Sequence, residues 1–63
     1  MKLTWNLFRI LQITAAIEAR NKNTNKDDWT EEMHRLHRAS VDIMNTYAQR
    51  WPRLIKVLRW YYK

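Results

Sequence analysis

Glu31, His34 and His37 are the residues whose types and spacing could bind a metal ion. Residues three apart lie on neighbouring turns of one helical face, and carboxylate and imidazole groups are zinc ligands. A closed structural site needs four ligands, however, which is one more than this set offers. We interpret both histidines as ordinary residues near the border of an apolar helix face, and we predict no metal and no cofactor.

Hydrolytic catalysis by a Ser/His/acid arrangement would have to use Ser40. Ser40 falls on a helix face that is predicted to be buried, beside Met33 and Met44, where a nucleophile could not reach a substrate. Loops that cradle phosphate groups require glycine, and the sequence has none. The sequence therefore predicts that the protein is not an enzyme and has no small-molecule substrate.

The closing segment, RWPRLIKVLRWYYK at positions 50–63, carries five basic side chains, no acid and four aromatic rings. On a helical projection its apolar residues share one arc, which predicts the third wall of a core. That arc comprises Trp51, Leu54, Ile55, Val57, Leu58, Tyr61 and Tyr62.

The bases of the same segment lie on the other side of the projection, and Trp60 points among them, so we expect Trp60 to be exposed. Tryptophan and arginine are enriched at binding hot spots. We predict a partner-binding surface made of Arg53, Lys56, Arg59, Trp60 and Lys63.

Three classes of partner fit such a surface. Protein association is favoured, because a small core, a wide apolar arc on the first helix and an aromatic tail leave apolar surface to cover. The partner would be a host or other protein, or a second copy of the chain in a homodimer. The alternative is nucleic acid, attracted by the net charge of +6. A membrane-surface amphipathic helix is the third choice.

The elements that must position these residues are helices. The chain has 63 residues, one proline, no glycine and no cysteine, so we predict one small all-α domain over residues 1–63 without disulfides. The periodicity predicts an antiparallel hairpin of helices over about 4–20 and 28–50, followed by a short third helix over about 52–62.

Thr4 is the predicted N-cap of the first helix, and Asp27 or Asp28 that of the second. Asparagines in the polar turn between these helices can adopt the left-handed conformation. Pro52 lacks an amide hydrogen, so the second helix should stop near Arg50 and Pro52 should open the third.

Apolar faces follow from the same projection. The first helix should bury a broad side made of Leu3, Leu7, Ile10, Leu11, Thr14 and Ile17, widened by Phe8 and Ile13. The second should bury Trp29, Met33, Leu36, Ser40, Ile43, Met44, Tyr47 and Trp51. No segment has the run of about 18 uninterrupted apolar residues that a membrane span needs, which favours a cytoplasmic protein.

The whole chain, from its opening MKLTWNLFRILQITAAIEAR to its close RWPRLIKVLRWYYK, resembles the small early-region accessory proteins of lambdoid bacteriophages. The likeness lies in size, absent cysteine and general texture. It implies an intracellular, non-catalytic protein, made early in infection, that alters host physiology or the choice between lysis and lysogeny by binding a host factor. Such proteins share no common site pattern, so the resemblance assigns no functional residue.

Overall fold

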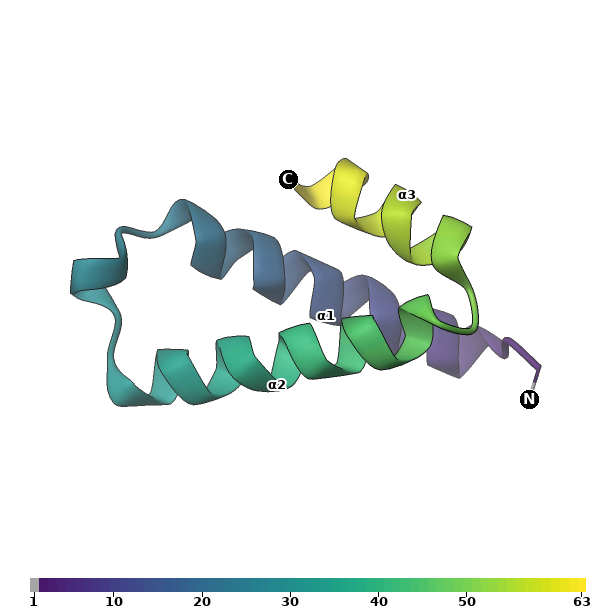
Figure 1. The fold of residues 1–63 in the computed structure, drawn as a ribbon, viewed down its shortest axis with the longest axis horizontal. Coiled ribbons are helices and arrows are strands. Elements are labelled where there is room, and N and C mark those ends of the chain that lie inside the picture. The colour runs from purple at the N-terminus through teal and green to yellow at the C-terminus, as the bar shows by residue number, and fades with distance from the viewer. Residues whose placement is uncertain (1) are drawn as a thin grey trace.

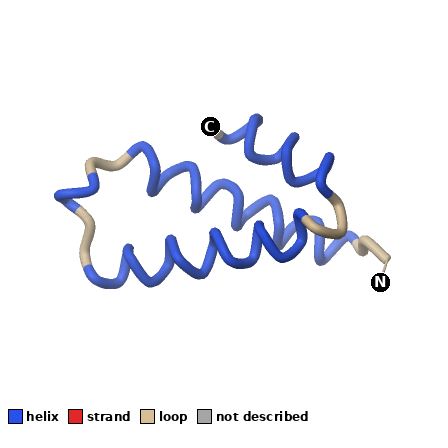
Figure 2. Tube along the Cα trace, in the orientation of Figure 1, coloured by secondary structure: helices blue, strands red, loops and turns tan. Residues whose placement is uncertain are grey.

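The computed structural model describes residues 2–63, and it is all-α. Helix α1 spans Trp5–Asn23, α2 spans Glu31–Ala48 and α3 spans Pro52–Tyr62, with a short 3-10 helix, η1, over Lys26–Asp28. Helices α1 and α2 run antiparallel, and α3 turns back from the end of α2 to lie along α1 (Figures 1 and 2). The predicted helical hairpin with a short third helix is confirmed.

Thr4 caps α1 as predicted. Its Oγ1 accepts a hydrogen bond from the backbone N–H of Leu7 at 3.1 Å, which satisfies one of the amides that a helix start leaves without a partner. The helix continues past the expected end at residue 20 as far as Asn23, with Arg20 and Lys22 in its last turn, where positive charge is favourable. Asn21, in this extra turn, is 4% exposed.

The turn between α1 and α2 differs from the prediction in two respects. No residue from 2 to 63 has a positive φ, so the asparagines do not use the left-handed conformation. The N-cap of α2 is Thr30, whose Oγ1 accepts from the N–H of Met33 at 3.2 Å, and not Asp27 or Asp28. Both aspartates belong to η1 instead.

A side-chain hydrogen bond within the turn accompanies the later start of α2. The indole Nε1–H of Trp29 donates to the carbonyl of Thr24 at 3.1 Å and folds the turn back on the end of α1. Trp29 is extended at φ −72° and ψ 130°, so the helix begins only after it, at Glu31. This bond is not visible in local sequence preferences.

Replacing Thr30 with alanine should lower the free energy of unfolding by about 1 kcal/mol, because the Met33 amide of the first turn loses its capping oxygen. The same change at Asp28 removes no cap and should have a smaller effect. Urea denaturation followed by circular dichroism measures both. An equal loss in the two variants would show that Thr30 does not cap α2.

Pro52 separates α2 from α3, as predicted. The α2 helix ends at Ala48, and Trp51 leaves the helical region with φ −131° and ψ 68°. Pro52 then occupies the first turn of α3, where its missing amide hydrogen leaves no bond unmade. The corner is closed by the carbonyl of Tyr47, which accepts from the N–H of Trp51 at 2.8 Å.

The core lies where the three helices meet. Its buried apolar residues come from every helix, and they are Leu11, Ala15, Met44, Ile55 and Leu58. Half-buried side chains complete it, including Leu7, Phe8, Tyr47, Trp51 and Leu54. Burial of Leu11, Thr14, Ser40 and Met44 confirms part of the two predicted faces.

Leu7, Phe8, Tyr47 and Trp51 also pack against the core as predicted, but other residues of those faces, including Leu3 at 41% exposed, were predicted wrongly. Ile10 and Ile13 are each 52% exposed, and Leu36 and Ile43 also lie outside the core. The buried stripe of α1 is rotated toward Ala15 and Glu18 and that of α2 is centred on Ser40 and Met44. The small residues Ala15 and Ser40 are buried between the helices, whereas the bulkier isoleucine and leucine side chains are turned outward.

Candidate partner-binding surface

Helix α3 presents four of the five predicted surface residues on its outer side. Ile55 and Leu58 face the core, and this orients the opposite side of the helix to solvent. Arg53, Lys56 and Lys63 are exposed. Trp60 is 64% exposed, which confirms the expectation drawn from its position among the bases.

Val57 and Tyr61 were predicted to be core residues, and this is wrong. Val57 is 57% exposed and Tyr61 is 70% exposed. At 100° per residue Val57 points about 160° away from Ile55, and a short helix resting on two neighbours buries a narrower stripe than the one assigned. Trp60 and Tyr61 follow Val57 by three and four residues, so all three side chains lie on neighbouring turns of one exposed face of α3.

The exposed side of α3 is thus a mixed apolar and cationic surface. We call it the α3 outer face, and it consists of Arg53, Lys56, Val57, Trp60, Tyr61 and Lys63. Tyr61 is held in place by an edge-on contact with the half-buried Tyr62, with ring centroids 4.9 Å apart. Two large rings and a β-branched side chain are therefore presented on a rigid helix between basic side chains.

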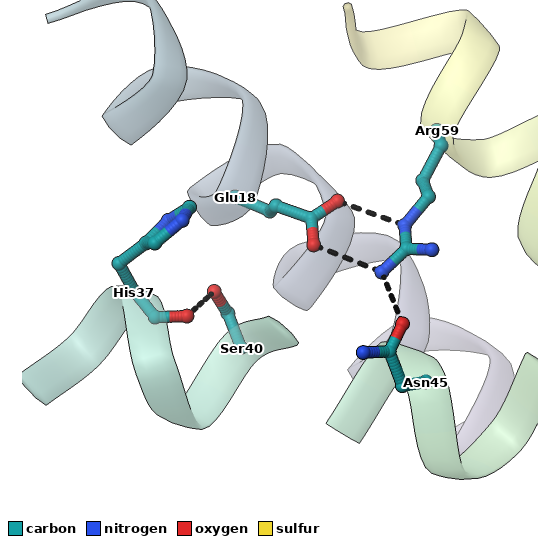
Figure 3. A network of polar contacts seen from close by, with 5 residues as sticks. All are labelled: Glu18, His37, Ser40, Asn45 and Arg59. Carbon is teal, nitrogen blue, oxygen red and sulfur yellow. Dashed lines mark hydrogen bonds and ion pairs between the residues drawn. The ribbon is translucent and has the colours of Figure 1, made fainter. Parts of the chain in front are cut away.

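Arg59 has a different role from the one predicted. Its guanidinium turns inward, where Nε donates to Glu18 Oε1 at 2.9 Å and Nη2 donates to Glu18 Oε2 at 3.0 Å (Figure 3). Nη2 also donates to Asn45 Oδ1 at 3.1 Å. One arginine on α3 therefore joins α1 and α2, and we treat it as an anchor of the surface and not as a member of it.

The Glu18 carboxylate explains why Arg59 turns inward. Glu18 is only 4% exposed, and an ionised carboxylate in such a place must be paired. The planar guanidinium matches both of its oxygens at once. A signal in the sequence could have revealed this pair, because Glu18 is the sole acid among the first 26 residues and lies on a helix whose face is otherwise apolar.

The inward turn of Arg59 also defines the charge outside. Residues 50–63 supply five of the positive charges, and Glu18 neutralises one of them. Arg53, Lys56 and Lys63 remain on the α3 outer face, around Trp60. Such a surface suits an acidic partner that also offers an apolar pocket.

The histidines and Ser40 are each engaged in contacts within the fold. The rings of His34 and His37 pack against Trp29, with centroids 5.0 Å and 4.9 Å from the indole. Ser40 is buried, and its hydroxyl donates to the His37 carbonyl at 2.8 Å (Figure 3). Within residues 2–63 no three His, Cys, Asp or Glu residues are gathered as metal ligands would be.

Two further findings bear on the kind of protein this is. Over the described part of the chain, each helix is too short or too polar to cross a bilayer. Comparison with protein-family models, with curated proteins and with solved structures found no match to this chain.

Proposed function

We propose that the chain is a non-enzymatic interaction module that binds a host protein through the α3 outer face. The observation that carries this proposal is the exposure of Trp60 and Tyr61 on a helix whose neighbouring side chains are basic. Exposed tryptophan costs free energy in water, and Trp is among the residues most often found at the centre of interfaces. The resemblance to phage early-region accessory proteins suggests that the partner is a bacterial factor.

The surface supports recognition in two ways. The rings and Val57 can fill an apolar pocket of the partner, and burial of this kind supplies most of the affinity at hot spots. Arg53, Lys56 and Lys63 can steer an acidic partner toward that contact and fix its orientation. The pair between Arg59 and Glu18 holds α3 in place beforehand, so little order has to be gained on binding.

Partner binding can be tested with a triple variant, Trp60→Ala with Arg53→Ala and Lys56→Ala. We expect it to keep its helicity and to lose the stoichiometric partner that the wild type recovers from bacterial lysate, because all three changes are on exposed side chains. Arg59 is left intact, since its loss would loosen α3 itself. Mass spectrometry of the recovered proteins is the measurement.

A matched control removes the same kinds of side chain elsewhere. Trp5 is 71% exposed, and Lys2 and Lys26 are exposed, so Trp5→Ala with Lys2→Ala and Lys26→Ala deletes one tryptophan and two positive charges outside the α3 outer face. This control should recover the partner as well as the wild type does. Equal recovery by both triple variants would show that the α3 outer face is not the binding surface.

Nucleic acid is the second candidate, because Trp60 and Tyr61 could stack on bases while Arg53 and Lys56 contact phosphates. It is distinguished by its dependence on salt. Binding to single-stranded nucleic acid should weaken steeply between low and physiological salt, and nuclease treatment of the lysate should abolish recovery of any co-purifying protein. Fluorescence anisotropy that stays flat with DNA and RNA at low salt would remove this candidate.

A further inference from the structure

A second apolar surface, made of residues outside the α3 outer face, lies on the hairpin. A groove of about 480 Å³ runs between the C-terminal half of α1 and the N-terminal half of α2. Ile17, Met33 and Leu36 form its apolar walls. Leu36 lies within α2 and is 46% exposed. Its side chain therefore faces water when the chain is a monomer.

The apolar surface continues beyond the groove. Ile10 lies seven residues before Ile17, and Ile43 lies seven residues after Leu36, so each shares a helical face with its counterpart. Because α1 and α2 are antiparallel, both extensions run toward the same end of the hairpin (Figure 2). We call the resulting surface the back face, and it consists of Ile10, Ile17, Met33, Leu36 and Ile43.

Most of the back face lies on the side of the hairpin away from α3, although Ile17 at its edge also lines a shallow pocket with Tyr62 of α3. Ala19 lines a small cavity together with Arg59 of α3, and Asn45 bonds to Arg59 directly, so these two positions mark the sides of α1 and α2 that α3 covers. Ile10 is nine residues from Ala19, and Leu36 is nine residues from Asn45. Nine residues at 100° each place two side chains on opposite sides of a helix.

The rims of the groove carry charges of opposite sign. Arg20 lies outside Ile17 on the α1 rim, and Glu32 lies outside Leu36 on the α2 rim, and both are exposed. Two copies of this surface do not repel strongly, because residues 50–63 supply five of the net six positive charges and belong to the opposite side of the molecule. The back face is therefore close to neutral and complementary to itself.

We propose that the back face binds a second copy of the chain and forms a two-fold symmetric dimer in which two hairpins stack into a four-helix core. The two-fold axis runs along the helices, so that α1 of one copy lies over α2 of the other. With this axis, the turns between α1 and α2 of the two copies lie at the same end of the dimer. Arg20 of each copy then meets Glu32 of the other, and the apolar rows face one another.

The charges select this arrangement over its alternative. A two-fold axis across the helices would place α1 on α1 and would bring Arg20 near Ile10 and the exposed Arg9 of the other copy. No pairing of Arg20 with Glu32 would result. The dimer also covers apolar side chains that one chain of 63 residues leaves in water, and a core this small rarely supplies more than about 3–5 kcal/mol alone.

The test exchanges the two charges. Sedimentation equilibrium of the wild type should show a concentration-dependent dimer of twice 7.8 kDa. Arg20→Glu and Glu32→Arg, each made alone, place like charges at both contacts and should each raise the dimer dissociation constant about tenfold. An equimolar mixture of these two variants should form mixed dimers, because Glu at position 20 then meets Arg at position 32 across the interface.

Mixed dimers are the decisive result, since a pair within one chain could not produce them. The double variant Arg20→Glu with Glu32→Arg should dimerise like the wild type, and circular dichroism on each protein verifies the fold. Leu36→Gln with Ile43→Gln should also weaken the dimer, whereas Val57→Gln on α3 should not. A wild type that stays monomeric, a mixture without mixed dimers, or a dimer lost on changing Val57 would each overturn the proposal.

These outcomes are independent of the proposed function. Recovery of a host protein depends on the α3 outer face, so it should persist in Arg20→Glu, whereas the triple variant at Trp60 should lose the host protein and keep the dimer. A dimer of this geometry carries two α3 outer faces on its far sides. It would bind two partner molecules, or one partner with a repeated site more tightly than a single chain could.

Discussion

Replacing Arg59 with alanine is expected to lower the free energy of unfolding by roughly 3 kcal/mol, the lower end of the range for removing one partner of a buried ion pair. Glu18 is only 4% exposed in the wild type. The change removes the two hydrogen bonds, at 2.9 and 3.0 Å, that its carboxylate accepts from Arg59. The lower end applies because the Arg59 side chain is 33% exposed, and water can enter part of the vacated space.

Urea denaturation at a fixed protein concentration measures this loss, and two further variants separate its causes. Arg59→Lys keeps the charge but loses the forked geometry, so it should be intermediate. Glu18→Met with Arg59→Met removes both charges and should recover much of the stability lost in Arg59→Ala. If Arg59→Ala proves as stable as the wild type, the Glu18 carboxylate must be hydrated without its partner. Arg59 would then not anchor α3 to the hairpin.

The same pair links the fold to the proposed function. Residues of the α3 outer face are positioned only while α3 is docked, and Arg59 is the residue that ties this helix to both α1 and α2. Arg59→Ala should therefore weaken partner recovery without changing any atom of the α3 outer face. Arg53→Ala should weaken recovery without changing the stability, because Arg53 is exposed. The two arginines can thus be separated by combining a stability measurement with a binding measurement.

Features that depend on a few neighbouring residues were predictable from the sequence. Thr4 caps α1 through its own hydroxyl, and Pro52 opens a helix because its ring fixes φ and its nitrogen has no hydrogen to donate. The exposure of Trp60 also followed from its position, since it points among bases on any helical projection. Each of these outcomes is decided within about one turn of the chain.

Features that depend on which helices touch were not predictable in the same way. The helical projection gave α1 a broad apolar side, but it could not tell that the buried stripe runs through Ala15, so Ile10 and Ile13 were placed in the core. Similarly, the direction of Arg59 is set by Glu18, 41 positions away. The width of the buried stripe on α3 likewise depends on how α3 packs against α1 and α2. Val57 and Tyr61 therefore belong to the candidate site and not to the core.

Met44→Ala should have a large effect on stability, and Leu36→Ala a small one, although a helical projection places both on the apolar face of α2. Met44 is 0% exposed and lies among the core residues of all three helices, so its truncation leaves a cavity and should cost about 2–5 kcal/mol.

Leu36 is 46% exposed and loses little contact within one chain, so its truncation should cost well under half as much in dilute solution, where monomers prevail. Thermal and urea unfolding should be compared at low and high protein concentration. If the back face pairs two copies, the penalty of Leu36→Ala grows with concentration, because the variant loses contacts that exist only in the dimer, whereas the penalty of Met44→Ala stays constant. Equal penalties for the two variants in dilute solution would mean that the buried side of α2 is centred on Leu36 after all.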